Sequence, residues 1–211
     1  MAERPVFVSM DHAPYVLRYS VQFEYAGGFA LVQSQKNITR IHEAYMKTGR
    51  KEPLEISSKS MQPVGIRLSA FHLLYDLNGK KIPVENIFQA GKTFVNGGPY
   101  LDLLGVTPKE AKRDERLRTS GALRCFTFER KEYPLIPRTA FYNWIWINAL
   151  LCNPDLVKEI EQYDSFTDVA FNPVKSLNCQ AEAAAVYTGL KKAGKLEEAM
   201  ASFDSFVNIL G

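Results

Sequence analysis

The sequence predicts a single, mainly helical α+β domain with a small antiparallel sheet or hairpin in its N-terminal half. Three observations support this prediction. The segment from Tyr15 to Tyr25 alternates apolar and polar residues, as a half-buried strand does. Asn78-Gly79 separates two extended runs, which is typical of a two-residue hairpin turn. The run from Thr139 to Leu151 is apolar almost all round, like a helix at the centre of a globular core.

The remaining elements follow from local patterns. Ile38, Ile41 and Tyr45 have helical spacing, and Gly49 is a plausible stop. The stretch 55–83 has an extended pattern, and the hairpin at its end leads into a helix that runs from Val84 to Lys92. Beyond it we expect a mixed-charge helix at 109–118 after Thr107-Pro108, a helix at 153–163, an irregular stretch at 166–178, a helix at 180–193 and a last amphipathic helix at 195–210.

Size and composition exclude several classes of protein. The chain has 211 residues, of which 46% are hydrophobic, enough for one full core. It has neither a charged leader followed by an apolar run nor a stretch near the ~20 apolar residues that a bilayer crossing needs, so we expect a cytoplasmic protein with no membrane contact. The net charge of +3 is too small to indicate nucleic-acid binding by itself.

Cysteines and histidines do not form a recognisable site in the sequence. Cys125, Cys152 and Cys179 stand far apart without a C-x-x-C pair, and His12, His42 and His72 are equally scattered. Packing explains His42, beside Ile41 and Tyr45, as well as chemistry does. We therefore expect free thiols, no metal and no cofactor.

The helix that follows the hairpin carries the most informative pattern in the chain. At 100° per residue, Glu85, Gln89 and Lys92 share one face, while Ile87 and Phe88 lie on the other. An acid, an amide and an amine would then converge opposite an apolar face that can be buried. Such a polar face is either solvated or part of a binding site, and solvated faces are the commoner case.

The order of these residues resembles the NADAR family. Leu68-Ser69-Ala70-Phe71, the Asn78-Gly79 hairpin and Glu85-Asn86-Ile87-Phe88-Gln89-Ala90-Gly91-Lys92 resemble the family's hallmark, a hairpin feeding an E-x-x-F-Q-A-x-K helix. Further segments resemble the branch of that family encoded beside DarT-type toxins: residues 4–8, 55–60, 97–100, 166–168 and 171–181. The resemblance to this branch covers most of the chain.

The resemblance implies an N-glycosidase, which cleaves a bond between ribose C1 and a nitrogen. In the toxin-linked branch the substrate would be ADP-ribose attached to guanine in DNA, with ADP-ribose as the product, and the enzyme would be the antitoxin of a DarT-type toxin. Another branch hydrolyses phosphorylated intermediates of riboflavin synthesis, which are the alternative substrate. The expected organisation is one domain spanning 1–211, with an N-terminal extension at 1–60, a catalytic core at 61–193 and a C-terminal helix at 194–211.

The chemistry then assigns roles to particular residues. Glu85 is the expected catalytic carboxyl group, although a glutamate in a first turn can also serve only the helix dipole. Lys92 either bonds a ribose hydroxyl or phosphate, or attacks an opened sugar to form a Schiff base. The candidate substrate-binding residues are Ser57, Ser58, Lys59, Ser60, Gln89, Tyr100, Asp114, Asp168, Asn172, Lys175, Ser176 and Asn178.

Ordinary roles remain open for most of these residues. The clusters at 57–60 and 175–178 are also what polar loops look like, and Asp114 and Asp168 are only possible second carboxylates. Tyr100, Phe126 and Tyr142 could stack on a base, but aromatic residues in a helical core usually pack. Two other functions also remain open: a module that shelters ADP-ribose without cleaving it, and an antitoxin that grips its toxin through Tyr15 to Tyr25 or the last helix.

Overall fold

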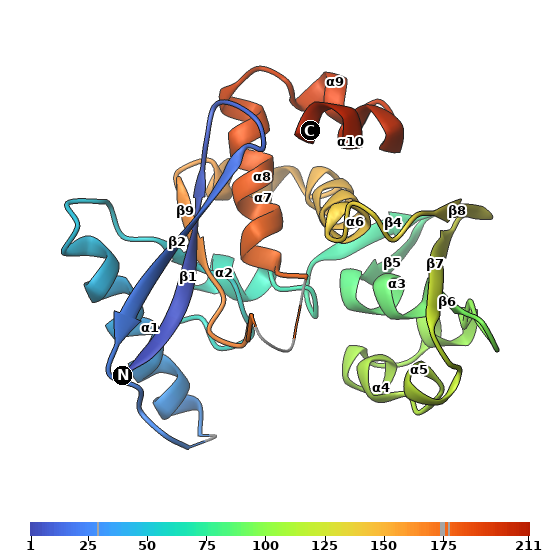
Figure 1. Cartoon of the computed structure of the whole chain (residues 1–211), viewed down its shortest axis with the longest axis horizontal. Coiled ribbons are helices and arrows are strands. Elements are labelled where there is room, and N and C mark those ends of the chain that lie inside the picture. Colours follow the sequence, from blue (N-terminus) through green and yellow to red (C-terminus); the bar gives the residue numbers. More distant parts are fainter. Residues whose placement is uncertain (29, 174–175, 177) are drawn as a thin grey trace.

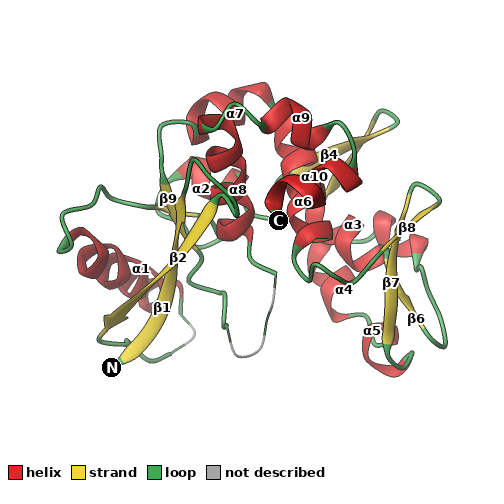
Figure 2. Cartoon of the chain, turned by 45° about the horizontal axis from the view of Figure 1, so that its top comes forward, coloured by secondary structure: helices red, strands yellow, loops and turns green. Residues whose placement is uncertain are grey.

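The computed structural model covers residues 1–211 and describes all of them except 29, 174, 175 and 177. The strands gather in groups at opposite ends of the molecule, and helices fill the space between them (Figure 2). The expected α+β class is confirmed. None of the helices in the described part of the chain has the length and apolarity that a membrane crossing requires.

The first sheet joins segments from both ends of the chain. It contains β1 (Ala2–Ser9), β2 (Val16–Phe23), β3 (Leu54–Glu55) and β9 (Ser165–Thr167) in the order β2-β1-β9-β3. The alternation expected for β2 is confirmed at Val21 and Phe23, which are buried against α1 (Leu31–Met46), whereas Leu17 is 41% exposed. β3 pairs with β9 in parallel and thereby brings residue 55 beside residue 167.

The hairpin and the helix after it form as expected. β4 (Leu74–Leu77) and β5 (Lys80–Pro83) pair antiparallel around Asn78 and Gly79, which have φ of 54° and 82°. Helix α3 (Val84–Ala90) follows without a break. The stretch before the hairpin is not extended throughout, because it contains α2 (Pro63–Arg67), a helix opened by a proline in its first turn.

Helix α3 ends earlier than the helical pattern indicates, because the chain continues into a second antiparallel sheet. It consists of β6 (Lys92–Phe94), β7 (Leu123–Phe128) and β8 (Lys131–Tyr133) in the order β6-β7-β8. The backbone N–H of Thr127 donates to the carbonyl of Gly91 at 2.6 Å, and Lys92 pairs with Phe126. Lys92 therefore begins a strand, and the expectation that it belongs to the helix is wrong.

The mixed-charge segment 109–118 is not one helix. After the short 3-10 helix η1 (Leu101–Gly105), α4 (Pro108–Arg113) begins with the expected Thr107 cap, and α5 (Arg116–Thr119) is separate. The break lies at Asp114, whose Oδ1 accepts hydrogen bonds from both the backbone N–H and the Nε–H of Arg116 at 2.9 Å. A side chain that bonds the nearby backbone competes with helix continuation in this way.

The core is helical and lies between the two sheets (Figure 1). Helix α6 (Ala140–Leu151), from the apolar run, is confirmed as central and buries Trp146 completely. It packs against α8 (Gln180–Lys192), and α7 (Pro154–Ile160) follows it in the chain. The last segment splits into α9 (Leu196–Met200) and α10 (Phe203–Leu210), because the Ser202 hydroxyl accepts from the Ser205 N–H and caps a new helix.

Candidate functional site

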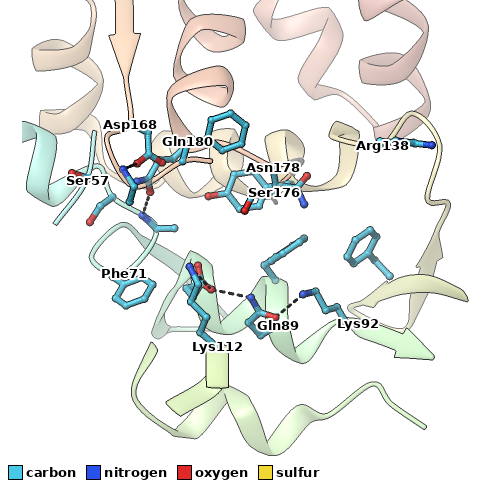
Figure 3. A pocket seen from close by; sticks show the side chains of 18 of the residues that line it. Ser57, Phe71, Gln89, Lys92, Lys112, Arg138, Asp168, Ser176, Asn178 and Gln180 are labelled. Atoms are coloured by element: carbon cyan, nitrogen blue, oxygen red, sulfur yellow. Dashed lines mark hydrogen bonds and ion pairs between the residues drawn. The ribbon is translucent and has the colours of Figure 1, made fainter. Parts of the chain in front are cut away.

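A cleft of about 880 Å³ lies between the two halves of the fold. Helices α3 and α4 and strands β6 and β7 form the floor of the cleft. The loops after β3 and β9 and before α8 form the opposite wall (Figure 3). Its polar lining residues are Ser57, Ser58, Lys59, Ser69, Glu85, Gln89, Lys92, Lys112, Arg138, Tyr142, Asp168, Ser176, Asn178 and Gln180. A cleft of this volume can accommodate a nucleotide-sized ligand.

The floor of the cleft holds the acid, the amide and the amine in one hydrogen-bonded chain. Lys92 Nζ donates to Gln89 Oε1 at 2.7 Å, and Gln89 Nε2 donates to Glu85 Oε1 at 2.9 Å (Figure 3). Glu85 and Gln89 are only 5% and 6% exposed. The polar face is therefore part of a cleft and is not solvated. Lys92 reaches it from β6, not from the helix.

The surroundings of Lys92 make its ammonium group easier to deprotonate than that of a solvated lysine. Burial lowers the pKa of the Lys92 ammonium, while the carboxylate of Glu85 acts in the opposite direction. The ammonium also lies 4.7 Å from the centre of the Phe88 ring. Lys92 can thus serve as a hydrogen-bond donor or, once deprotonated, as a nucleophile.

A second lysine, which the sequence analysis did not single out, approaches Glu85 from α4. Lys112 Nζ lies 3.7 Å from Glu85 Oε1 and 5.3 Å from the centre of the Phe71 ring. Its side chain is 58% exposed, so it stands at the mouth of the cleft. Its mixed-charge segment has the sequence of a solvated helix, so no signal in the sequence singled out Lys112.

Asp168 lies on the opposite wall, where its carboxyl group is unusually easy to protonate. Burial, and to a lesser extent the carboxylate of Glu55, raises the pKa of Asp168 to about 7, although the backbone N–H of Ala170, which donates to its Oδ1 at 2.9 Å, acts in the opposite direction. Near neutral pH this group is a mixture of acid and carboxylate. The structure thus places a second carboxyl group in the cleft, as the sequence analysis allowed for Asp168.

Gln180 ties the loops of this wall together. Its Oε1 accepts from the backbone N–H of Ala70 at 2.7 Å, and its Nε2 donates to the carbonyl of Ile56 at 2.6 Å. Two loops from the first half of the chain are thus fixed by the first residue of α8. Sequence reasoning missed this role, because it depends on a contact between residues 110 positions apart.

The loop 57–59 lines the cleft, and a buried network holds it. Ser57 Oγ donates to Glu55 Oε1 at 2.7 Å, and Thr167 Oγ1 donates to Glu55 Oε2 at 2.6 Å. His42 Nε2 lies 2.9 Å from Thr167 Oγ1, and burial lowers the pKa of His42. His42 is therefore a buried network residue. Lys59 Nζ donates to Ser34 Oγ at 3.1 Å, and Ser58 is exposed at the edge.

Several candidate substrate-binding residues lie outside the cleft lining. Ser60 faces the backbone of α2, where its Oγ accepts from the Gln62 N–H, and Tyr100 bonds Ser120. The carboxylate of Asp114 is held by Arg116. Asn172 is also not among the residues that line the cleft, and Lys175 lies outside the described residues. The placement of Ser60, Tyr100 and Asp114 in a site is thus not supported.

Other candidates and several additional residues do line the cleft. Ser176 is exposed, and the side-chain oxygen of Asn178 is buried without a partner among the described residues, so it could accept a hydrogen bond from a ligand. Phe88 packs edge-on against Tyr142, and burial raises the pKa of Tyr142. Additional lining residues are Phe71, Leu123, Phe126, Leu135, Ile136 and Phe171. Within the described residues, no cluster of His, Cys, Asp and Glu is placed to hold a metal ion.

Fold and site together define an α+β domain with a carboxylate–amide–amine floor in a cleft suited to a polar, nucleotide-sized ligand. A comparison with family models identifies the family: the chain belongs to the NADAR family of DarT1-associated antitoxins, whose model matches residues 2–211. The resemblance seen in the sequence is thereby confirmed, and the family supports an antitoxin role for the chain in a DarT system. NADAR proteins are generally N-glycosidases. A comparison with curated proteins gives no match.

Proposed function

We propose that this protein is an N-glycosidase that removes ADP-ribose from guanine bases in DNA and so reverses the action of a DarT-type toxin. The observation that carries the proposal is the hydrogen-bonded chain Glu85–Gln89–Lys92 on the floor of a nucleotide-sized cleft. The reaction breaks the bond between the ribose C1 and a guanine nitrogen. Water supplies a hydroxyl group to C1 and a proton to the departing nitrogen.

Glu85 is the proposed base that takes the proton from water. Its Oε1 accepts from Gln89 and lies near Lys112, whereas no described contact engages Oε2. The carboxylate thus has one oxygen held in position and one available for water or a sugar hydroxyl group. A fixed base close to the reacting carbon contributes ~10² to 10⁴ to the rate of such reactions.

Lys92 has two possible roles in the proposal. As an ammonium group, it holds a ribose hydroxyl or phosphate while it bonds Gln89. As a neutral amine, it attacks C1 in place of the guanine nitrogen, which leaves with a proton; the ribose ring opens, and water later hydrolyses the Schiff base at C1. The effect of burial, which lowers the pKa of Lys92, supports the second role without excluding the first.

The polar wall fits the ADP-ribose part of the substrate. Ser57, Ser58 and Lys59 offer hydroxyl groups and a cation for a diphosphate, and Ser176 and Asn178 add hydrogen-bonding groups across the cleft. Asp168, with a pKa of about 7, can donate or accept a proton at neutral pH. A guanine inside a duplex is out of reach, so the modified base is taken from single-stranded DNA or flipped out.

A direct test incubates the purified protein with an ADP-ribosylated guanosine oligonucleotide and, separately, with a phosphorylated ribosylamine of the riboflavin pathway. We expect free ADP-ribose and unmodified DNA from the first substrate, measured by chromatography, and little turnover of the second. Turnover of the ribosylamine alone would favour the riboflavin-pathway activity. Tight binding of ADP-ribosylated DNA without release would identify a sheltering module, and rescue of toxin-expressing cells by an inactive variant would identify a toxin-binding antitoxin.

A further inference from the structure

The loop between β8 and α6 forms one rim of the cleft and exposes an aliphatic side chain. Leu135, Ile136 and Arg138 of this loop line the cleft. Ile136 is 75% exposed, whereas Leu135 packs against the main core. Pro134 and Pro137 flank the two aliphatic residues and restrict their backbone. The loop is thus anchored on the core while Ile136 projects at the mouth of the cleft.

The two ends of the cleft differ in chemistry. Ser57, Phe71 and Lys112 lie toward one end, and Lys92 and Arg138 lie toward the other (Figure 3). Phe126 belongs to the Lys92 end, because the two residues are paired across β6 and β7. If the hydroxyl-rich end near Ser57 takes the ADP-ribose, the guanine and its DNA strand leave the cleft past the end that Arg138 borders.

Arg138 differs from the other cations of the cleft in having no partner within the part of the chain that the structure describes. Lys59 bonds Ser34, Lys92 bonds Gln89, and Lys112 lies beside Glu85 and Phe71. Among the described residues, no hydrogen bond, ion pair or ring contact engages the Arg138 guanidinium. An unpaired arginine next to an exposed isoleucine offers the two contacts that a DNA strand requires, a cation for a phosphate and an apolar surface for a base.

We propose that this rim loop binds the DNA strand next to the modified guanine, with Arg138 on a backbone phosphate and Ile136 against the neighbouring base. This inference rests on the proposed function. An aliphatic side chain beside a displaced base can occupy the place of its lost stacking partner, as apolar wedges do in DNA-bending proteins. The loop would then distinguish a modified guanine in DNA from the same modification on a free nucleoside.

The test compares two substrates, ADP-ribosylated guanosine in a single-stranded oligonucleotide and the free ADP-ribosylated nucleoside. For each of Arg138→Gln and Ile136→Thr, the measured quantity is the ratio of kcat/KM for the oligonucleotide to kcat/KM for the nucleoside. Arg130→Gln and Val95→Thr are matched controls, because both residues are exposed and neither lines the cleft. The nucleoside reaction serves as the internal reference for folding and chemistry.

We expect the ratio to fall at least about fourfold for Ile136→Thr, because the loss of one buried methylene group alone has that effect and this substitution replaces an ethyl group with a hydroxyl. For Arg138→Gln, the slope of log kcat/KM against log salt concentration should become shallower by about 0.7 for the oligonucleotide only, since one phosphate contact is lost. Equal losses on both substrates, or no difference from the controls, would overturn the proposal.

A binding measurement separates this proposal from the proposed function. Fluorescence anisotropy of an unmodified single-stranded oligonucleotide is measured at several salt concentrations with the parent protein, Arg138→Gln and Arg130→Gln. Weaker, less salt-dependent binding by Arg138→Gln alone would support the rim loop as a DNA contact even if the parent protein cleaves neither substrate. Identical binding curves for all three proteins would refute it.

Discussion

The amide nitrogen of Gln89 donates to Oε1 of Glu85 across one turn of α3, at 2.9 Å. This bond fixes the direction of a carboxylate that is 5% exposed, and Lys112 stands 3.7 Å from the same oxygen. The two oxygens of Glu85 are therefore not equivalent, since Oε1 is engaged by the protein and Oε2 is not engaged by any described contact. A base that must act on water or a sugar hydroxyl group needs such a free oxygen.

Replacing Glu85 with glutamine should abolish the release of ADP-ribose. The substitution keeps the size of the side chain but removes the group that accepts a proton, so we expect a loss of at least ~10²-fold in kcat. Release of ADP-ribose from modified DNA, followed by chromatography, measures the effect. The control is Glu197→Gln, which changes an exposed glutamate in α9, and circular dichroism reports folding. Activity within about tenfold of the parent would remove Glu85 from the mechanism.

The two roles of Lys92 can be separated by reduction during turnover. If the amine attacks the opened sugar, borohydride should trap a covalent adduct on Lys92, detected as a mass increase of one peptide. Lys92→Arg should give no adduct, because a guanidinium group cannot act as the amine. Lys51, exposed and outside the cleft lining, is the control for nonspecific reaction. Full turnover without any adduct would leave only the hydrogen-bonding role.

Asp168 should make the protein less stable as the pH rises. Its pKa is raised from the ordinary value of 3.8 to about 7, chiefly by burial. Between these values the unfolded chain has released the proton and the folded chain retains it, so stability is lost across this window as the pH increases. Asp168→Asn removes the buried charge and keeps an oxygen for the Ala170 N–H.

The substitution should therefore raise the melting temperature more at pH 8 than at pH 4.5, relative to the parent protein. Thermal unfolding followed by circular dichroism at both pH values gives the comparison. Asp155→Asn, at an exposed position in α7, controls for the removal of a surface charge. The same shift at both pH values would show that Asp168 has an ordinary pKa in the folded protein.

Gly65 should not tolerate a side chain. An added methyl group would overlap the carbonyl oxygen of Glu55 and the side chain of Ser60, so the segment that carries Ser57 to Lys59 would have to move. We expect Gly65→Ala to lower the free energy of unfolding by about 1–3 kcal/mol. Urea unfolding measures this loss. Gly27→Ala, where no atom of the described residues other than the adjacent ones lies within 4 Å of the added methyl group, should leave the stability nearly unchanged. An equally stable Gly65→Ala would refute the packing argument.

Patterns within a few residues of one another predicted the elements that depend on local chemistry. The Asn78-Gly79 turn, the Thr107 cap and the apolar helix α6 each carry their signal in the residues that form them. The strands β6 and β9 do not, because their pairing partners lie far away in the sequence. Gly91 shows the difference: its carbonyl accepts from Thr127, and this long-range bond ends a helix that the local pattern continues.

Two kinds of site residue could be predicted from the sequence: those on α3, and the loop residues Ser57 to Lys59, Asp168, Ser176 and Asn178, which line the cleft. Glu85 and Gln89 were found from helical spacing, and Lys92 was found although it lies on a strand. Lys112 and Gln180 could not be found, since one sits in a segment that resembles a solvated helix and the other acts through backbone atoms of distant loops. Ser60 and Asp114 had side chains suitable for binding a substrate. In the structure, however, Ser60 Oγ accepts from the backbone N–H of Gln62, and Asp114 Oδ1 accepts from the backbone N–H of Arg116.

The two hydrogen bonds of Gln180, to Ala70 and Ile56, mean that the cleft is completed late in the synthesis of the chain. Glu85 and Lys92 precede Gln180 in the chain and are therefore synthesised well before it. The wall that faces them is fastened only after residue 180 emerges. A chain that ends before α8 would lack this fastening and also the core contacts of α8 with α6 and β1, so a complete cleft requires nearly the whole chain.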